Sequence, residues 1–175
     1  MDRLAAIADK AECTEVVHRV ARAIDRRDPE LLATLFHPDA TDDHGMFAGT
    51  AADFIAWVMP VLGTMKRTQH LIGQVLVEVS GEQARAESYF IAHHTIAGPD
   101  GDVLMLAAGR YLDRFERRDG VWKIAHRLAV YDWNDTRAST DSFDRSDPNG
   151  WTYGVAGPAD ASYAHFGPSG LLSEQ

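Results

Sequence analysis

The chain has 175 residues, of which 45% are hydrophobic and 25% charged, the size and balance of one globular domain with its own core. Its 26 acidic residues against 17 Lys and Arg give a formal charge of −9, and the bases are scattered, which argues against a nucleic-acid partner. No apolar run reaches the roughly 18–20 residues that span a bilayer, which argues against a membrane partner.

Two features of the N-terminal segment bear on location and redox chemistry. Residues 1–13 contain acids and no uncharged apolar stretch, so they do not form a secretory signal, and we expect a cytoplasmic protein. Cys13 is the only cysteine and cannot form an internal disulfide. Because it lies on an apolar helical stripe, we expect a buried, unreactive thiol rather than a nucleophile.

Two helices are predicted before residue 38. The first ends at Asp25, and its apolar positions recur every three or four residues, which is typical of one face of an amphipathic helix. Those positions are Cys13, Val17, Val20 and Ile24. Asp28 is a typical N-cap for the second helix, and Pro29 suits its first position. This helix is expected to include residues 31–36 and to end before Pro38.

A strand and a turn are expected over residues 40–50. A third helix follows, because Thr50 and Asp53 form a capping-box pair at the start of residues 51–58. We expect Pro60 to disturb the end of this helix, since proline removes a backbone hydrogen bond.

The second half of the chain carries strand signals. Beyond residue 74 the apolar period changes from about 3.6 to about 2, and turn sequences separate the apolar runs. The strands are expected at residues 75–79, 84–96, 103–116 and 121–133, with turns at 80–83, 98–101 and 117–120. Helices followed by hairpin-linked strands predict an α+β fold, in which a curved antiparallel sheet carries the helices on one face.

Two further expectations concern burial. Val75, Val77 and Val79 share one face of a strand, and we expect an interface between copies of the chain to bury them. Residues 134–175 are rich in Asp, Ser, Gly and Pro, yet they contain four aromatic residues of interest, Trp151, Tyr153, Tyr163 and Phe166. We therefore expect an ordered C-terminal extension that packs on its own or on a neighbouring subunit.

The order of segments resembles the SnoaL-like branch of the nuclear-transport-factor-2-like superfamily. The resemblance depends on AIDRRD at 23–28, TQH at 68–70, the string at 110–127 and YDW at 131–133. It is greatest for the group with hexachlorocyclohexane dehydrochlorinase, bile-acid 7α-dehydratase and scytalone dehydratase, which are cofactor-independent lyases. This resemblance implies a cone-shaped α+β barrel over residues 1–133, a homotrimer, and a pocket inside the curved sheet.

The same resemblance assigns a candidate catalytic pair. In that group an Asp that ends the first helix pairs with a His after the third helix, and Asp25 and His70 occupy these positions. Some members also carry an Arg on the last strand, which Arg127 matches. The chain departs from the group at Val20, where relatives have Lys or Tyr to help bind a leaving group or substrate.

The pair has a clear chemical use. Histidine has an ordinary pKa of about 6.5, which suits proton transfer at physiological pH, and a carboxylate on one ring nitrogen fixes the tautomer and stabilises the imidazolium. If the pair exists, an Asp25 oxygen lies about 2.6–3.2 Å from a ring nitrogen of His70 at the floor of the largest pocket. In the alternative reading, Asp25 only caps its helix and His70 is a satisfied polar group.

Four more residues are candidate substrate contacts. Strand alternation places Arg127 and Tyr131 on one face, where the guanidinium could hold a developing anion or, alternatively, form a surface salt bridge. Tyr111 shares a face with Gly109, whose small size would leave room for a ligand, although Tyr111 can also be core. Two histidines complete the set. The family resemblance implies that His94 points inward and His93 outward, and His44 could share a pocket-facing side with Asp42 two residues before it.

Metal and nucleotide motifs are lacking in the sequence. Adjacent His93 and His94 point to opposite faces and cannot bind one metal ion, and no zinc-type ligand spacing occurs. Phosphate-binding glycine loops and the nucleophile elbow are also lacking, so we expect no cofactor. The remaining histidines are read as surface or structural residues: His18, His37, His126 and His165.

The leading functional prediction is a lyase or isomerase that removes a proton from carbon in a small hydrophobic ring compound. His70 would be the base, and Arg127 with Tyr131 or His94 would stabilise the negative charge or help expel water or halide. Two alternatives stay open on the sequence. One is a polyketide cyclase that uses the same pair, and the other is a non-catalytic ligand binder or dioxygenase β-subunit-like module.

Overall fold

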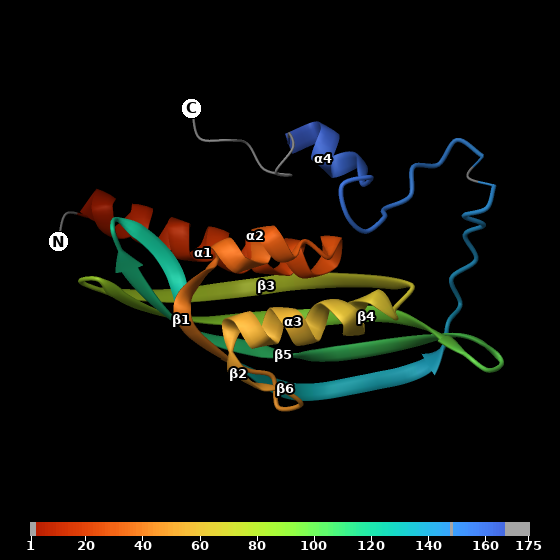
Figure 1. Ribbon diagram of the computed structural model, residues 1–175, viewed down its shortest axis with the longest axis horizontal. Helices are drawn as coiled ribbons and strands as arrows, with labels where there is room; N and C mark the ends of the chain where they lie inside the picture. The colour runs from red at the N-terminus through yellow and green to blue at the C-terminus, as the bar shows by residue number, and fades with distance from the viewer. Residues whose placement is uncertain (1–2, 148, 167–175) are drawn as a thin grey trace.

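The computed structural model describes residues 3–147 and 149–166. Helices lie over a long curved sheet, and the C-terminal segment returns along the first helix (Figure 1). In chain order the elements are α1 (Arg3–Arg26), α2 (Pro29–Thr34), β1 (Phe36–Asp43), β2 (Ala48–Thr50), α3 (Ala51–Gly63), β3 (Arg67–Ser80), β4 (Gln83–Gly98), β5 (Gly101–Arg118), β6 (Val121–Ala138) and α4 (Ala161–Phe166). None of these helices is long and apolar enough to cross a membrane.

The six strands form one open sheet in the order β2-β1-β6-β5-β4-β3. Strands β3 to β6 are antiparallel neighbours joined by hairpins, as the alternating pattern predicts. Strand β1 pairs with β6 in parallel, so the sheet is mixed and not purely antiparallel, and it does not close into a barrel. The expectation was wrong here because β1 and β6 are distant in sequence, and no hairpin imposes their direction.

The local signals hold with differences at element ends, the largest at β3, which begins at residue 67 and not at 75. Asp28 caps α2 by accepting a hydrogen bond from Leu31 N, and Thr50 caps α3 through Asp53 N. Phe36 is a strand residue rather than the end of α2, because it pairs with β6. Helix α3 continues past Pro60 to its end at residue 63, and β6 extends five residues beyond the predicted end at 133.

Helices α1 and α3 cover the concave face of the sheet, and the core lies between them. Val77 is buried in this core, and Val75 and Val79 pack against it. The expectation that these valines need an interface between copies is therefore wrong, since the chain's own helices cover them. The homotrimer stays a prediction, and its surface would be the outer face, where Leu71 and Leu76 are more than 60% exposed.

A bulge bends β6 beside the cavity described below. Gly109 lies opposite Tyr131 while its neighbour Ala108 lies opposite Trp133, so β6 holds one extra residue at this point. A Cβ atom on Gly109 would lie 2.0 Å from Val130 O. Glycine is needed here for the close approach of two backbones, and not to leave room for a ligand as expected.

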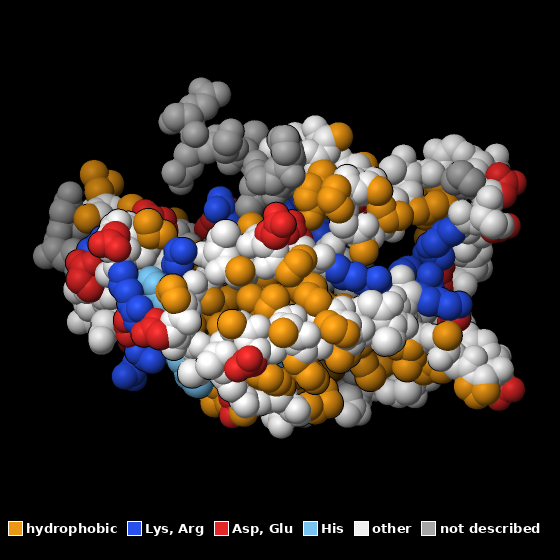
Figure 2. Space-filling view, viewed as in Figure 1, with side chains coloured by type: hydrophobic (Ala, Val, Ile, Leu, Met, Phe, Trp, Pro, Cys, Tyr) orange, Lys and Arg blue, Asp and Glu red, His pale blue; other side chains and the backbone are white. Residues whose placement is uncertain are grey.

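The described part of the C-terminal extension packs on α1 of the same subunit. Tyr163 in α4 is buried, and its hydroxyl donates to Asp28 Oδ2 at 2.7 Å. Arg26 Nη1 and Asp160 Oδ2 lie 2.6 Å apart. Figure 2 shows hydrophobic side chains in the middle of one face, over α3, and Lys and Arg side chains where the extension leaves the sheet. Residues 148 and 167–175 lie outside the described residues.

Candidate functional site

Asp25 and His70 form the pair that the sequence predicts. Asp25 is on the last turn of α1, and His70 is on β3, which packs beside that helix. Asp25 Oδ1 lies 2.7 Å from His70 Nδ1, and Asp25 Oδ2 accepts the backbone N–H of His70 at 2.8 Å. Two bonds from one residue fix the carboxylate against the ring. Because Nδ1 is occupied, Nε2 is the ring nitrogen that remains for a substrate.

Two cavities meet at His70. The first, of about 550 Å³, lies between the helices and the concave face of the sheet, and its walls are mostly apolar. The second, of about 720 Å³, lies between α1, β3 and the C-terminal extension; Asp25 borders it together with arginines. The larger cavity is therefore behind the pair, on the Asp25 side, so the prediction that the pair lies at the floor of the largest pocket is wrong: the candidate residues line the smaller, apolar cavity. The first has the apolar walls and few polar groups of a site for a small hydrophobic ligand.

His94 points into the first cavity beside His70, as the resemblance implies, whereas His93 borders the second cavity. The His70 and His94 rings meet edge to face, with centroids 5.6 Å apart. His94 Nδ1 is 2.9 Å from Thr68 Oγ1, and Thr68 was not predicted as part of the site. Burial and the neighbouring His70 lower the pKa of His94 to about 4, so this ring is neutral near physiological pH.

Arg127 reaches the wall of the first cavity, but its guanidinium is engaged. Its Nε and Nη2 donate to the two oxygens of Asp113, both at 2.7 Å, and the residue is only 2% exposed. The Tyr111 ring lies under the guanidinium at 4.2 Å. Arg127 thus supplies a fixed positive charge balanced by Asp113, in a buried form of the salt bridge considered above.

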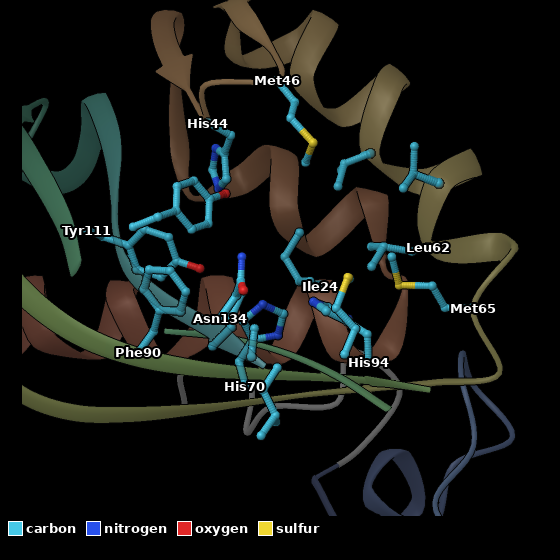
Figure 3. Close-up of a pocket in the computed structure, with 18 of the residues that line it drawn as sticks. Ile24, His44, Met46, Leu62, Met65, His70, Phe90, His94, Tyr111 and Asn134 are labelled. Carbon is cyan, nitrogen blue, oxygen red and sulfur yellow. The ribbon is translucent and has the colours of Figure 1, made fainter. Parts of the chain in front are cut away.

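Asp42 and His44 form a second carboxylate–imidazole pair at the same cavity. Asp42 Oδ1 contacts His44 Nδ1, and the Asp42 side chain is fully buried. The His44 ring stacks on Phe54 with centroids 4.6 Å apart and lines the cavity. Figure 3 shows His44 on one wall, beside Tyr111, with His70 and His94 across the cavity.

Aromatic side chains complete the wall near the bulge. Tyr111 stacks on Phe90 with centroids 4.3 Å apart, and Tyr131 meets Phe90 edge-on at 6.0 Å. Burial raises the pKa of the Tyr111 hydroxyl, and burial together with Asp42 raises that of Tyr131. Both tyrosines are therefore neutral and can offer hydrogen bonds to a ligand.

The cavity thus collects all seven candidate residues, six of which line it directly while Asp25 stands behind His70. The sequence analysis missed Asp113, Thr68 and Phe90. Asp113 had a usable signal, because it lies two positions after Tyr111 and so shares its inward face. Thr68 and Phe90 follow from the same alternation, two residues before His70 and four before His94.

The part of the chain that the structure describes holds neither a metal-ligand cluster nor an exposed thiol. Within residues 3–147 and 149–166, no group of three His, Cys, Asp or Glu is placed to hold a metal ion. Cys13 is completely buried, and burial, with Asp9 nearby, raises the pKa of its thiol to about 12, as expected for an unreactive residue. His37 is structural, since its Nε2 lies 2.9 Å from Glu116 O.

Comparison with known proteins gives the same fold. The uncharacterized protein Rv2910c of Mycobacterium tuberculosis is 29% identical over 128 residues, which are 71% of this chain and 86% of that protein. A type 2 hexachlorocyclohexane dehydrochlorinase superposes with a TM-score of 0.70 at 21% identity, covering 79% of this chain and 95% of the other. A putative scytalone dehydratase from Novosphingobium aromaticivorans has a TM-score of 0.65 at 22% identity, with 79% and 95% covered.

The two solved structures share the fold of this chain, and at these identities the likeness extends to the fold alone. A model of the SnoaL-like domain matches residues 5–128, from the start of α1 into β6. This match covers most of the chain and includes His70 and Arg127. The chain therefore belongs to the SnoaL-like domain family.

Proposed function

We propose that this protein is a cofactor-independent lyase or isomerase that removes a proton from carbon in a small hydrophobic ring compound. The observation that carries this proposal is the Asp25–His70 contact at 2.7 Å, with the other ring nitrogen left for the apolar cavity. A neutral imidazole oriented in this way is a general base, and such a base contributes about 10²–10⁴ in rate. Asp25 stabilises the imidazolium that forms on proton transfer.

The surroundings of His70 suit an acidic C–H next to a carbonyl group. The tyrosine hydroxyls of the cavity can donate hydrogen bonds to an enolate oxygen, and the fixed charge of Arg127 lies directly behind Tyr111. A non-catalytic binding module has no need of a carboxylate held by two bonds on the same histidine. For this reason we favour an enzyme over a binding module. We also propose elimination or isomerisation rather than cyclisation as its reaction.

The test is exchange of the carbon-bound proton. A panel of mono- and bicyclic ketones is incubated in D2O with the protein, and loss of the α-proton is followed by NMR. We expect exchange with the wild type and a loss of about 10²-fold or more with His70→Gln, since the base is removed. His126→Gln is the matched control, because that ring contacts Thr41 and lines neither cavity. Exchange at the wild-type rate in His70→Gln contradicts the proposal.

A further inference from the structure

The two Asp–His pairs of the cavity differ in how the carboxylate is satisfied. Both oxygens of Asp25 accept a hydrogen bond, and its side chain borders a second cavity that arginines line. The Asp42 side chain is fully buried, its Oδ1 contacts His44, and its Oδ2 has no hydrogen-bond partner within the part of the chain that the structure describes. Such a carboxylate is costly to bury unless a positive charge compensates it.

The charges around Asp42 show which group can compensate it. Arg127 lies directly opposite Asp42 in the β1–β6 register, but Asp113 already balances its charge with two hydrogen bonds. Tyr111 and Tyr131, the other titratable groups that face Asp42, are neutral. The cluster therefore keeps one negative charge unless the Asp42–His44 pair holds one further proton, which the contact places between Asp42 Oδ1 and His44 Nδ1. With that proton the buried cluster is neutral.

A pair that holds a spare proton is suited to donate it. The Nδ1 atom of His44 is bound to Asp42, so the proton available to a ligand is the one on Nε2. The ring is held flat against Phe54, which fixes its direction within the cavity. Figure 3 places it across the cavity from His70, so a ligand between the walls can contact both rings.

We propose that His44, held by Asp42, is the proton donor to the leaving oxygen, and that the substrate is a ring compound with a hydroxyl group β to the acidic C–H. This inference rests on the proposed function. His70 Nε2 takes the proton from carbon, the C–H electron pair forms the C=C bond, and the C–O bond breaks with its electrons to oxygen. The oxygen takes the Nε2 proton of His44 and leaves as water.

The state of each histidine and the chemistry of the leaving group explain why His44, and not His94, is the proton donor. A halide leaves without a proton, whereas a hydroxyl group needs one, so a dedicated donor favours dehydration. His94 is the other ring near His70, and its pKa of about 4 leaves it without a spare proton. After the reaction, His70 releases its extra proton to solvent and His44 regains one, which restores both pairs.

The first test compares two leaving groups on one ring. A bicyclic β-hydroxyketone needs a proton at its leaving oxygen, whereas the matching β-acetoxyketone expels acetate without one. We expect His44→Gln to lower kcat/KM about 10²-fold or more for the hydroxyketone and only a few-fold for the acetoxyketone. His70→Gln should lower both and His126→Gln neither. Equal losses for the two substrates in His44→Gln would overturn the assignment of His44.

The second test does not need turnover. Nitrogen-15 NMR of the histidine side chains reports the proton count of each ring in the wild-type protein near neutral pH. We expect a doubly protonated His44, and loss of its second proton in Asp42→Asn. A singly protonated His44 in the wild type overturns the inference. If neither ketone is turned over while His44 is doubly protonated, the proposed function fails and the proton-carrying pair stands.

Discussion

The substitution Asp113→Ala removes the partner of the buried Arg127 charge, and we expect it to destabilise the protein strongly. The carboxylate accepts hydrogen bonds from Nε and Nη2 of Arg127, both at 2.7 Å. The side chains of both residues are at most 3% exposed, so water cannot replace the lost oxygens without a rearrangement of the sheet. The variant leaves a guanidinium in the wall of the cavity with only the Tyr111 ring and the already committed Asp42 nearby.

Breaking a buried ion pair in this way costs about 3–5 kcal/mol of unfolding free energy. For a domain of this size, a melting temperature falls by about 2–4 °C per kcal/mol, so we expect a loss of roughly 6–20 °C. The double variant D113L/R127M should recover most of this loss, because it removes both charges and keeps the volume.

Urea unfolding followed by tryptophan fluorescence measures this cost. The matched control is Asp135→Ala, since Asp135 and Arg137 form an exposed pair on β6 at 3.3 Å. Exposed pairs contribute about 0–1 kcal/mol, so the control should unfold near the wild-type midpoint. If Asp113→Ala unfolds at the same midpoint as Asp135→Ala, the reasoning about the buried pair is refuted.

Three further outcomes follow from the structure. The pKa of His94 in the folded protein, about 4, lies below the ordinary 6.5, so the unfolded chain binds a proton first as pH falls. Between neutral pH and about pH 5, the unfolding free energy of the wild type, measured in urea, should therefore drop by about 2 kcal/mol more than that of His94→Gln. Asp160→Ala removes the acceptor of Arg26 and of the Val155 and Ser162 backbone N–H groups, so limited proteolysis should cut residues 139–166 several-fold faster. An unchanged rate would show that these bonds do not hold the C-terminal extension on α1. Cys13 should resist a thiol reagent in the native protein and react in urea, and native labelling would contradict its burial.

The Asp25–His70 contact could be predicted only in part from local patterns. Asp25 ends an amphipathic helix that the apolar period predicts, whereas His70 lies in β3, which begins at residue 67 and not at the expected 75, so its pairing with Asp25 came from the family resemblance. The helix N-caps at Asp28 and Thr50 were predictable for the same local reason. Local signals thus determine where Asp25 and the helix starts lie, and the resemblance supplies His70.

The Asp113–Arg127 pair could not be found in this way, because it depends on strand register. The two residues face each other across β5 and β6, between irregularities at Ala108–Gly109 and Arg114–Phe115. Each irregularity shifts the pairing by one residue, and a one-residue shift moves a side chain to the other face. The alternating pattern gives the face of each residue, but it does not show where a bulge lies.

The parallel pairing of β1 with β6 was also beyond the sequence, and the second Asp–His pair depends on it. The sequence places Asp42 and His44 on one side of a short strand but does not say which strand is its neighbour. In the structure Asp42 lies opposite Arg127, its carboxylate is completely buried, and His44 is at the cavity wall. Tertiary contacts between distant segments decide this, and they override local preference.

The charges of the cavity wall explain why a neutral substrate suits it. Among the described residues, four ionisable side chains that line the cavity are each paired with a group of opposite charge or with a carboxylate. The pairs are Arg127 with Asp113, Asp132 with Arg110, His44 with Asp42 and His70 with Asp25. An ionic ligand would find no free countercharge and would lose its hydration. A neutral ring compound would lose little hydration on entry, and in the proposed reaction charge would appear on it only when His70 takes a proton. The fixed pairs and tyrosine hydroxyls would then stabilise the transition state more than the bound substrate, which is the condition for catalysis.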